Sequence, residues 1–162
     1  MSTDFQILSH AIAAEVARLL PEYLLVPEDF AIARGNCALA MMNAAGDSAG
    51  RLFGDYAPRQ RETAQIVWKK AHQVWLTGYA TGTYETLAYS GQVDEESIGL
   101  QRPEYIGWLG GVEAQTASGE RLVLAFSGMR GEQDVAILQQ AAANLGSFKL
   151  VYSWRENAVD GV

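Results

Sequence analysis

The sequence has a single cysteine and few basic residues. One cysteine, Cys37, excludes a disulfide within the chain. The 12 lysines and arginines are outnumbered by 19 aspartates and glutamates, which gives a net charge of −7. Because binding to a phosphate backbone requires clustered Lys and Arg, this balance argues against a nucleic-acid partner. No stretch free of charged residues approaches the roughly 20 apolar residues that a membrane span needs, so we expect no membrane partner.

Motifs that mark metal or phosphate chemistry are also missing. The chain has no CxxC pair, no HExxH and no Walker loop, and its two histidines alone do not make a metal site. The first residues lack the basic-then-apolar pattern of a secretion signal, which makes a cytoplasmic location the expectation. Cys37 opens an apolar run that ends at Met42, so we interpret it as a buried structural thiol rather than a nucleophile.

The periodicity of apolar residues predicts both helices and strands. Helices are expected at residues 4–20 (ended by Pro21), 27–34, 59–77, 83–89 and 132–145. Hairpins are expected from residues 37–43 with 48–56 and from 111–115 with 121–126, residues 94–96 and 101–104 are expected in loops, and 148–154 reads as a terminal strand or interface segment. Antiparallel hairpins separated by helices predict an α+β fold with a central sheet. Residues 121–126 are apolar on both faces and belong at its centre.

The strongest candidate site is the junction between residues 121–126 and the last helix. Ser127, Gly128 and Arg130 form a glycine-rich turn into that helix, where the backbone is open to a ligand and free N–H groups are available. Glu132 and Asp134 follow in the first turn of the helix. The alternative is that both acids only stabilise the helix dipole.

A second candidate lies on the helix at residues 59–77. Trp68, His72 and Trp75 fall on one stripe, which suits a planar apolar ligand or a haem-like ring. A packed core with one satisfied histidine is the alternative. Lys70, one of three lysines, would need a pKa depressed by burial to act in acid–base or Schiff-base chemistry, and otherwise is a solvated lysine. On this helix Leu76 is expected on the apolar face and Gln73 off it.

A third candidate is the approach to the second hairpin. The paired glycines Gly110 and Gly111 permit a bulge or a close approach of the backbone to a bound group. A plain turn would have the same sequence.

Several of these segments resemble one known family. They are residues 106–112 (Ile-Gly-Trp-Leu-Gly-Gly-Val), residues 124–134 with the Ser-Gly and Gln-Asp pairs, the Lys-Ala pair on the helix at 64–74, and the Ala-Gly pair at 45–46. Together they are similar to the GlcG/HbpS-like family, over about residues 37–146. The positions that match family motifs are Lys70, Gly110, Gly111, Ser127, Gly128, Gln133 and Asp134.

The resemblance implies a profilin-like α/β/α sandwich around a five-stranded antiparallel sheet, and a homo-oligomer. Relatives include haem-binding proteins, proteins of small-molecule catabolism and the C-terminal domain of PduO proteins, so haem is a candidate cofactor. We expect one domain over residues 1–162, with N-terminal helices at 4–34, a core at 37–146 and a tail strand at 147–156.

Three functions remain open from the sequence. The favoured one is a module that binds a small molecule, with haem or a related planar ligand as candidates. A pocket between the Lys70 helix and the Gly128 turn is the observation that would tell most about it. The alternative is a lyase or isomerase that uses Asp134 or Glu132 as general base and Lys70 or Arg130 to hold an anion. The third is a structural partner protein without a ligand.

Overall fold

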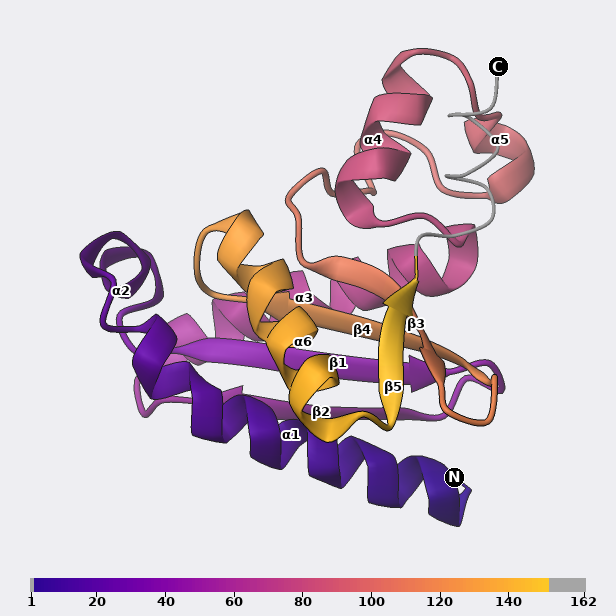
Figure 1. Cartoon of the computed structure of the whole chain (residues 1–162). Helices are drawn as coiled ribbons and strands as arrows, with labels where there is room; N and C mark the ends of the chain where they lie inside the picture. The colour runs from indigo at the N-terminus through magenta and orange to yellow at the C-terminus, as the bar shows by residue number, and fades with distance from the viewer. Residues whose placement is uncertain (1, 152–162) are drawn as a thin grey trace.

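The computed structural model describes residues 2–151 (Figure 1). The elements in chain order are α1 (Thr3–Tyr23), α2 (Pro27–Ala33), β1 (Cys37–Asn43), β2 (Ser48–Phe53), α3 (Ala57–Thr77), α4 (Thr81–Tyr89), α5 (Glu95–Ile98), β3 (Gly111–Thr116), β4 (Arg121–Ser127), α6 (Gly131–Leu145) and β5 (Phe148–Val151). None of the helices among these described residues is both long and apolar enough to span a membrane.

The five strands form one antiparallel sheet in the order β2-β1-β4-β3-β5. Both expected hairpins are present, and β1 pairs with β4 so that Ala40 lies opposite Ala125. Six of the seven residues of β4 are buried. A strand with water on neither face must be apolar throughout, which is why residues 121–126 read as a central strand. The α+β prediction with a five-stranded antiparallel sheet is confirmed.

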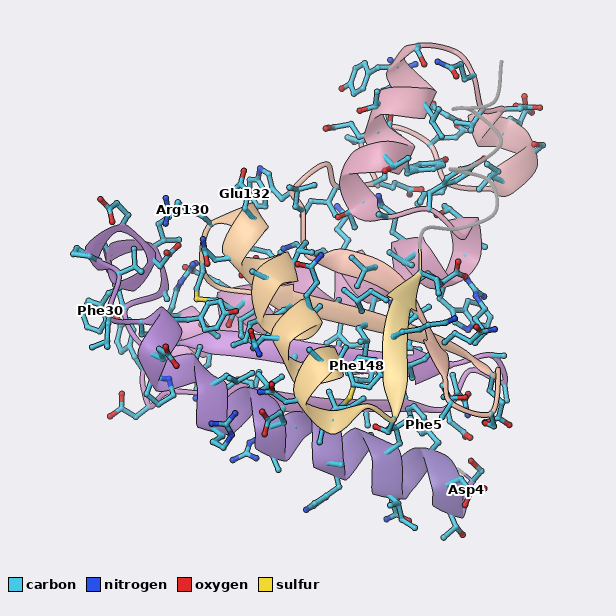
Figure 2. All side chains as sticks on the ribbon, in the orientation of Figure 1. Asp4, Phe5, Phe30, Arg130, Glu132 and Phe148 are labelled. Atoms are coloured by element: carbon cyan, nitrogen blue, oxygen red, sulfur yellow. The ribbon has the colours of Figure 1, made fainter. Side chains whose placement is uncertain are left out.

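Helices cover both faces of this sheet. On one face α1 and α6 pack against large side chains such as Leu39, Met41 and Phe126. Figure 1 shows these two helices in front of the strands and α3 behind them, and Figure 2 labels Phe5 of α1 and Phe148 of β5, which join the same core. On the other face α3 lies on small strand residues, including Ala38 and Ala40 from β1. Small residues let a helix approach the sheet closely, so α3 lies near the strands.

A second, smaller apolar cluster lies away from the sheet. It is formed by α4, α5 and the chain that returns to β3, which Figure 1 shows beyond the end of the sheet. Tyr84 is fully buried there, its hydroxyl donates to the carbonyl of Leu100, and its ring meets that of Tyr105 edge-on with centroids 5.2 Å apart. Through Leu100 and Tyr105, this cluster anchors the segment that leads to β3.

Several predicted boundaries were wrong. Pro21 does not end the first helix, because a proline in the last turn loses only its own N–H bond, and Leu24 still donates to the carbonyl of Leu20. The helix starts at Thr3 with Ser2 as its N-cap. The strand expected at 48–56 ends at Phe53, and the acidic loop at 94–96 contributes to the short helix α5, which Asp94 caps. The last strand is described to Val151, and the rest of the segment expected to residue 154 lies outside the described residues.

Candidate functional site

A pocket of about 500 Å³ lies between α3, the segment before β3 and the turn from β4 into α6. It lies between the Lys70 helix and the Gly128 turn, the place where a pocket would tell most about the binding hypothesis. The lining residues are Ile32, Arg59, Ile66, Lys70, Gly107, Trp108, Leu109, Ser127, Gly128, Met129, Gly131, Glu132 and Asp134. The volume falls within the range of about 300–1,000 Å³ that is common for small-molecule sites.

A buried ion pair forms the floor of the pocket. Lys70 Nζ lies 3.1 Å from Asp134 Oδ2, and both side chains are almost wholly buried. The same Nζ donates to the carbonyl oxygens of Leu109 at 2.5 Å and Phe126 at 3.0 Å. Asp134 Oδ1 accepts from the backbone N–H of Met129 at 3.0 Å. The pair therefore ties α3, β4, α6 and the segment before β3 together, and the interpretation of Lys70 as a solvated lysine is wrong.

Burial acts on the protonation of both partners. Burial raises the pKa of the Asp134 carboxyl from 3.8 to about 7, against the opposing charge of Lys70. Burial also lowers the pKa of the Lys70 ammonium, and the nearby Asp134 carboxylate opposes this. The three acceptors around Nζ match the three N–H groups of an ammonium, so we assign Lys70 as charged near neutral pH. Asp134 then exchanges its proton close to pH 7.

This raised pKa predicts how stability depends on pH. Between about pH 4 and pH 7 the folded protein holds a proton on Asp134 that the unfolded chain has lost, so stability falls as the pH rises through this window. The stabilisation is complete below the unfolded pKa and lost above the folded one. Urea denaturation at pH 5 and pH 8 should show a larger loss for the wild type than for Asp134→Asn. Equal losses in the two proteins would contradict the assignment.

The segment that lines the pocket ahead of β3 is held by buried polar side chains. The Gln73 amide on α3 donates to the carbonyl of Ile106 at 2.9 Å and accepts from its N–H at 2.7 Å. Thr81 Oγ1 on α4 donates to the carbonyl of Trp108 at 2.7 Å. A side chain that hydrogen-bonds to both the N–H and the carbonyl of one residue holds that residue in place, as a neighbouring strand does in a sheet. Trp108 and Leu109 are thereby presented at the pocket from a fixed backbone.

A second carboxylate holds α2 beside the turn. Asp29 is fully buried and accepts from the Nε, Nη2 and backbone N–H of Arg130 at 3.0, 2.8 and 3.1 Å. Figure 2 shows Arg130 and Glu132 at the start of α6, with Phe30 across from them on α2. The Arg130 guanidinium lowers the pKa of the Asp29 carboxyl by hydrogen bonding. This bidentate pair places Ile32, three residues along the same helix, in the pocket wall.

The structure brings two of the three sequence candidates together. Of the candidate residues, Lys70, Ser127, Gly128, Glu132 and Asp134 line the pocket. Gly110, Gly111, Arg130 and Gln133 lie next to it in the chain but do not line it.

The aromatic stripe lies elsewhere on α3. Trp68 packs over Gly50 of β2, and Trp75 Nε1 donates to the carbonyl of Asn43 at 3.0 Å. His72 is exposed beside Trp68, with ring centroids 5.8 Å apart. These three residues line no part of the pocket, because the stripe faces the β2 side of the sheet.

The sequence did not point to Arg59 and Ile66, which line the pocket from the same side of α3 as Lys70. Counting back from Lys70 by four and then seven residues along a helix gives Ile66 and Arg59, so helical spacing was a usable signal.

A pattern Gly-x-Ser-x-Gly at residues 46–50 does not form a catalytic site of the kind found in acyl-transfer enzymes. In those enzymes the pattern forms a turn from a strand into a helix, whereas here it forms the β1–β2 turn and the start of β2.

No family model matches this sequence, and no match is found among curated proteins. Solved structures do match. The PduOC:heme complex has a TM-score of 0.57 at 19% identity, covering 88% of this chain and 93% of that chain. HbpS has a TM-score of 0.56 at 14% identity, with 83% and 87% covered, and the Ybr137w protein 0.56 at 15%, with 83% and 76% covered. These likenesses support the resemblance to the GlcG/HbpS-like family at the level of architecture: the chain has the fold of PduOC, HbpS and Ybr137w.

Proposed function

We propose that this chain is a small-molecule-binding protein of the GlcG/HbpS-like family and that the pocket between α3 and the β4–α6 turn is its binding site. The observation that carries the proposal is the pocket itself, which combines apolar walls with a charged floor. Four of the residues that resemble family motif positions, Lys70, Ser127, Gly128 and Asp134, line it. Two of the similar solved structures are PduOC bound to heme and HbpS, which supports a ligand as the partner of this fold.

The walls favour a planar ligand. Trp108 is 65% exposed and Leu109 is 39% exposed, although both line the pocket. Ile66 of α3 and Met129 of the β4–α6 turn supply further apolar surface. An exposed indole at the mouth of a pocket provides a flat face against which a ring can stack. Covering these side chains with a ligand would remove apolar surface from water, which favours binding.

The apolar walls of the pocket suit the ring of a haem, but the lining offers few side chains that can bind its iron. Haem iron in proteins is held by His, Met, Cys or Tyr. Among the lining residues only Met129 is of these types, and it is 6% exposed. His72 and His10 lie outside the pocket, and the Lys70 amine is taken by three acceptors. The lining therefore does not fit a histidine-ligated haem, and we extend the proposal to planar ligands in general rather than to haem alone.

Acid–base catalysis has less support than binding. The pKa of Asp134, near 7, suits a general base. The two cations expected to hold an anion are both engaged, however, Lys70 by Asp134 and Arg130 by Asp29. Such an enzyme would have to break a buried ion pair for each turnover. We therefore propose binding as the function.

The proposal is tested by filling the pocket. Ile66 lines it from α3 and is only partly buried, so Ile66→Trp should fill the space at little cost in stability. We expect the planar probe 2-naphthol to bind the wild type with one-to-one stoichiometry in isothermal titration calorimetry, and the variant at least about 10-fold more weakly. Ile7→Trp, the same change on an exposed position of α1, is the control. Absence of saturable binding to the wild type, or equal binding by Ile66→Trp, would refute the assignment.

A further inference from the structure

One polar atom beside the pocket has no hydrogen-bond partner. Arg59, in the first turn of α3, lines the pocket, and its Nη1 donates to Glu62 at 3.1 Å. Its Nε is buried and unpartnered, and within residues 2–151 it is the one buried side-chain nitrogen or oxygen in that condition. Buried N–H groups without a partner are rare because they lose their hydrogen bonds to water without replacement. Because Nε makes no hydrogen bond in its present position, turning the guanidinium towards an acceptor on a bound molecule would cost no bond at this atom.

Of the two cations that line the pocket, Arg59 and Lys70, Arg59 is the one that can still bind an anion. All three protons of the Lys70 ammonium go to acceptors within the protein. The carboxylate partner of Arg59, Glu62, keeps 59% of its side chain exposed, and ion pairs in water are weak. The guanidinium therefore retains most of its attraction for a further anion.

The rest of the lining selects the kind of anion. Glu132 and Asp134 line the same pocket, so a ligand group with two negative charges would meet repulsion there. A carboxylate carries one charge and is planar, which matches the edge of a guanidinium. From these observations we infer that the ligand is a carboxylic acid with a planar apolar body, and that the Arg59 guanidinium turns into the pocket to hold its carboxylate.

The apolar body has a defined place in this arrangement. Ile66 lies two turns along α3 from Arg59 on the same side of the helix, and Trp108 stands on the facing segment. A ring system attached directly to the carboxylate lies against these two side chains when Arg59 holds the acid. This inference rests on the proposed function and adds the chemical class of the ligand.

The test compares three probes with one ring system: 2-naphthoate, its neutral methyl ester and 2-naphthyl phosphate. Calorimetric titration of the wild type should show naphthoate binding at least about 10-fold more tightly than the ester or the phosphate, as expected for one hydrogen bond to a charged group. Arg59→Gln should lower naphthoate affinity to that of the ester and leave the ester unchanged. Arg61→Gln, on the exposed side of the same helix, should change neither.

Arg59→Lys separates charge from geometry. It keeps the positive charge but loses the planar guanidinium, so its naphthoate affinity should fall between those of the wild type and Arg59→Gln. Equal affinity for naphthoate and its ester in the wild type, or unchanged naphthoate binding in both Arg59 variants, would overturn the inference. In that case retained binding of 2-naphthol, with its loss in Ile66→Trp, would leave the proposed function standing. Failure of every probe to bind would overturn both.

Discussion

Lys70→Met is expected to lower the free energy of unfolding by about 3–5 kcal/mol, the range found when one partner of a buried ion pair is removed. The variant leaves the Asp134 carboxyl group buried without the cation that now stabilises its charged form. It also leaves the carbonyl oxygens of Leu109 and Phe126 without the donor that now reaches them. Urea denaturation followed by circular dichroism measures the change.

The neighbouring lysine is the matched control. Lys69 is exposed on the same helix, so Lys69→Met should change stability by less than about 0.5 kcal/mol. The double variant Lys70→Met/Asp134→Asn removes both charges and keeps an acceptor for the Met129 N–H. Its loss should be smaller than the sum of the two single losses by at least about 1 kcal/mol. A loss below about 1 kcal/mol for Lys70→Met would show that the pair does not hold these elements together.

Gly110→Ala is expected to cost about 2–6 kcal/mol, from backbone strain together with overpacking. Gly110 has φ of 119°, a conformation that side chains other than glycine rarely adopt. A methyl group at this position would lie 2.5 Å from the carbonyl oxygen of Phe126 and 2.7 Å from Lys70 Nζ. The substitution therefore strains the backbone and pushes against the ion pair. Thermal and urea denaturation would measure the cost.

Gly146→Ala provides the comparison for that variant. Gly146 ends α6 with φ of 66°, and nothing lies within 4 Å of an added methyl group. It should therefore cost only the conformational penalty of about 1–2 kcal/mol. If the two alanine variants were equally destabilised, close packing around Gly110 would not be the cause. A larger loss for Gly110→Ala, together with weaker binding of 2-naphthol, would tie the packing to the pocket.

Both members of the buried ion pair were candidates from the sequence, on separate helices, and were combined only in the alternative hypothesis of a lyase or isomerase. Asp134 was placed at the start of the last helix and Lys70 on a helix 64 residues earlier. Periodicity describes each helix by itself and contains no information on which helices meet. The pairing of β1 with β4, and the packing of α3 across both, bring the two residues within 3.1 Å. That contact belongs to the tertiary structure.

The orientation of α3 was predicted only in part. The apolar period places Val67 and Ala71 on the buried face, and both are buried, but Gln73 is 3% exposed and Leu76 is 48% exposed, the reverse of the prediction. An amide is buried at low cost when both of its groups are hydrogen-bonded, and the segment at Ile106 satisfies Gln73. Hydrophobicity therefore assigned Gln73 to the wrong side, since its partner comes from a distant part of the chain.

The sequence by itself determined the secondary structure and the α+β class, because apolar periodicity and turn residues are local properties. It also identified four of the five polar or charged side chains that line the pocket: Lys70, Ser127, Glu132 and Asp134, but not Arg59. Only the tertiary structure decided which of them meet, that Lys70 is satisfied by Asp134, and that Arg59 keeps a buried N–H without a partner. Hydrogen-bond satisfaction depends on groups brought together by folding, and a linear sequence does not specify those contacts. The scarcity of cysteine excluded a disulfide within the chain, the scarcity of basic residues argued against a nucleic-acid partner, and the fold then placed Lys70 in a buried ion pair.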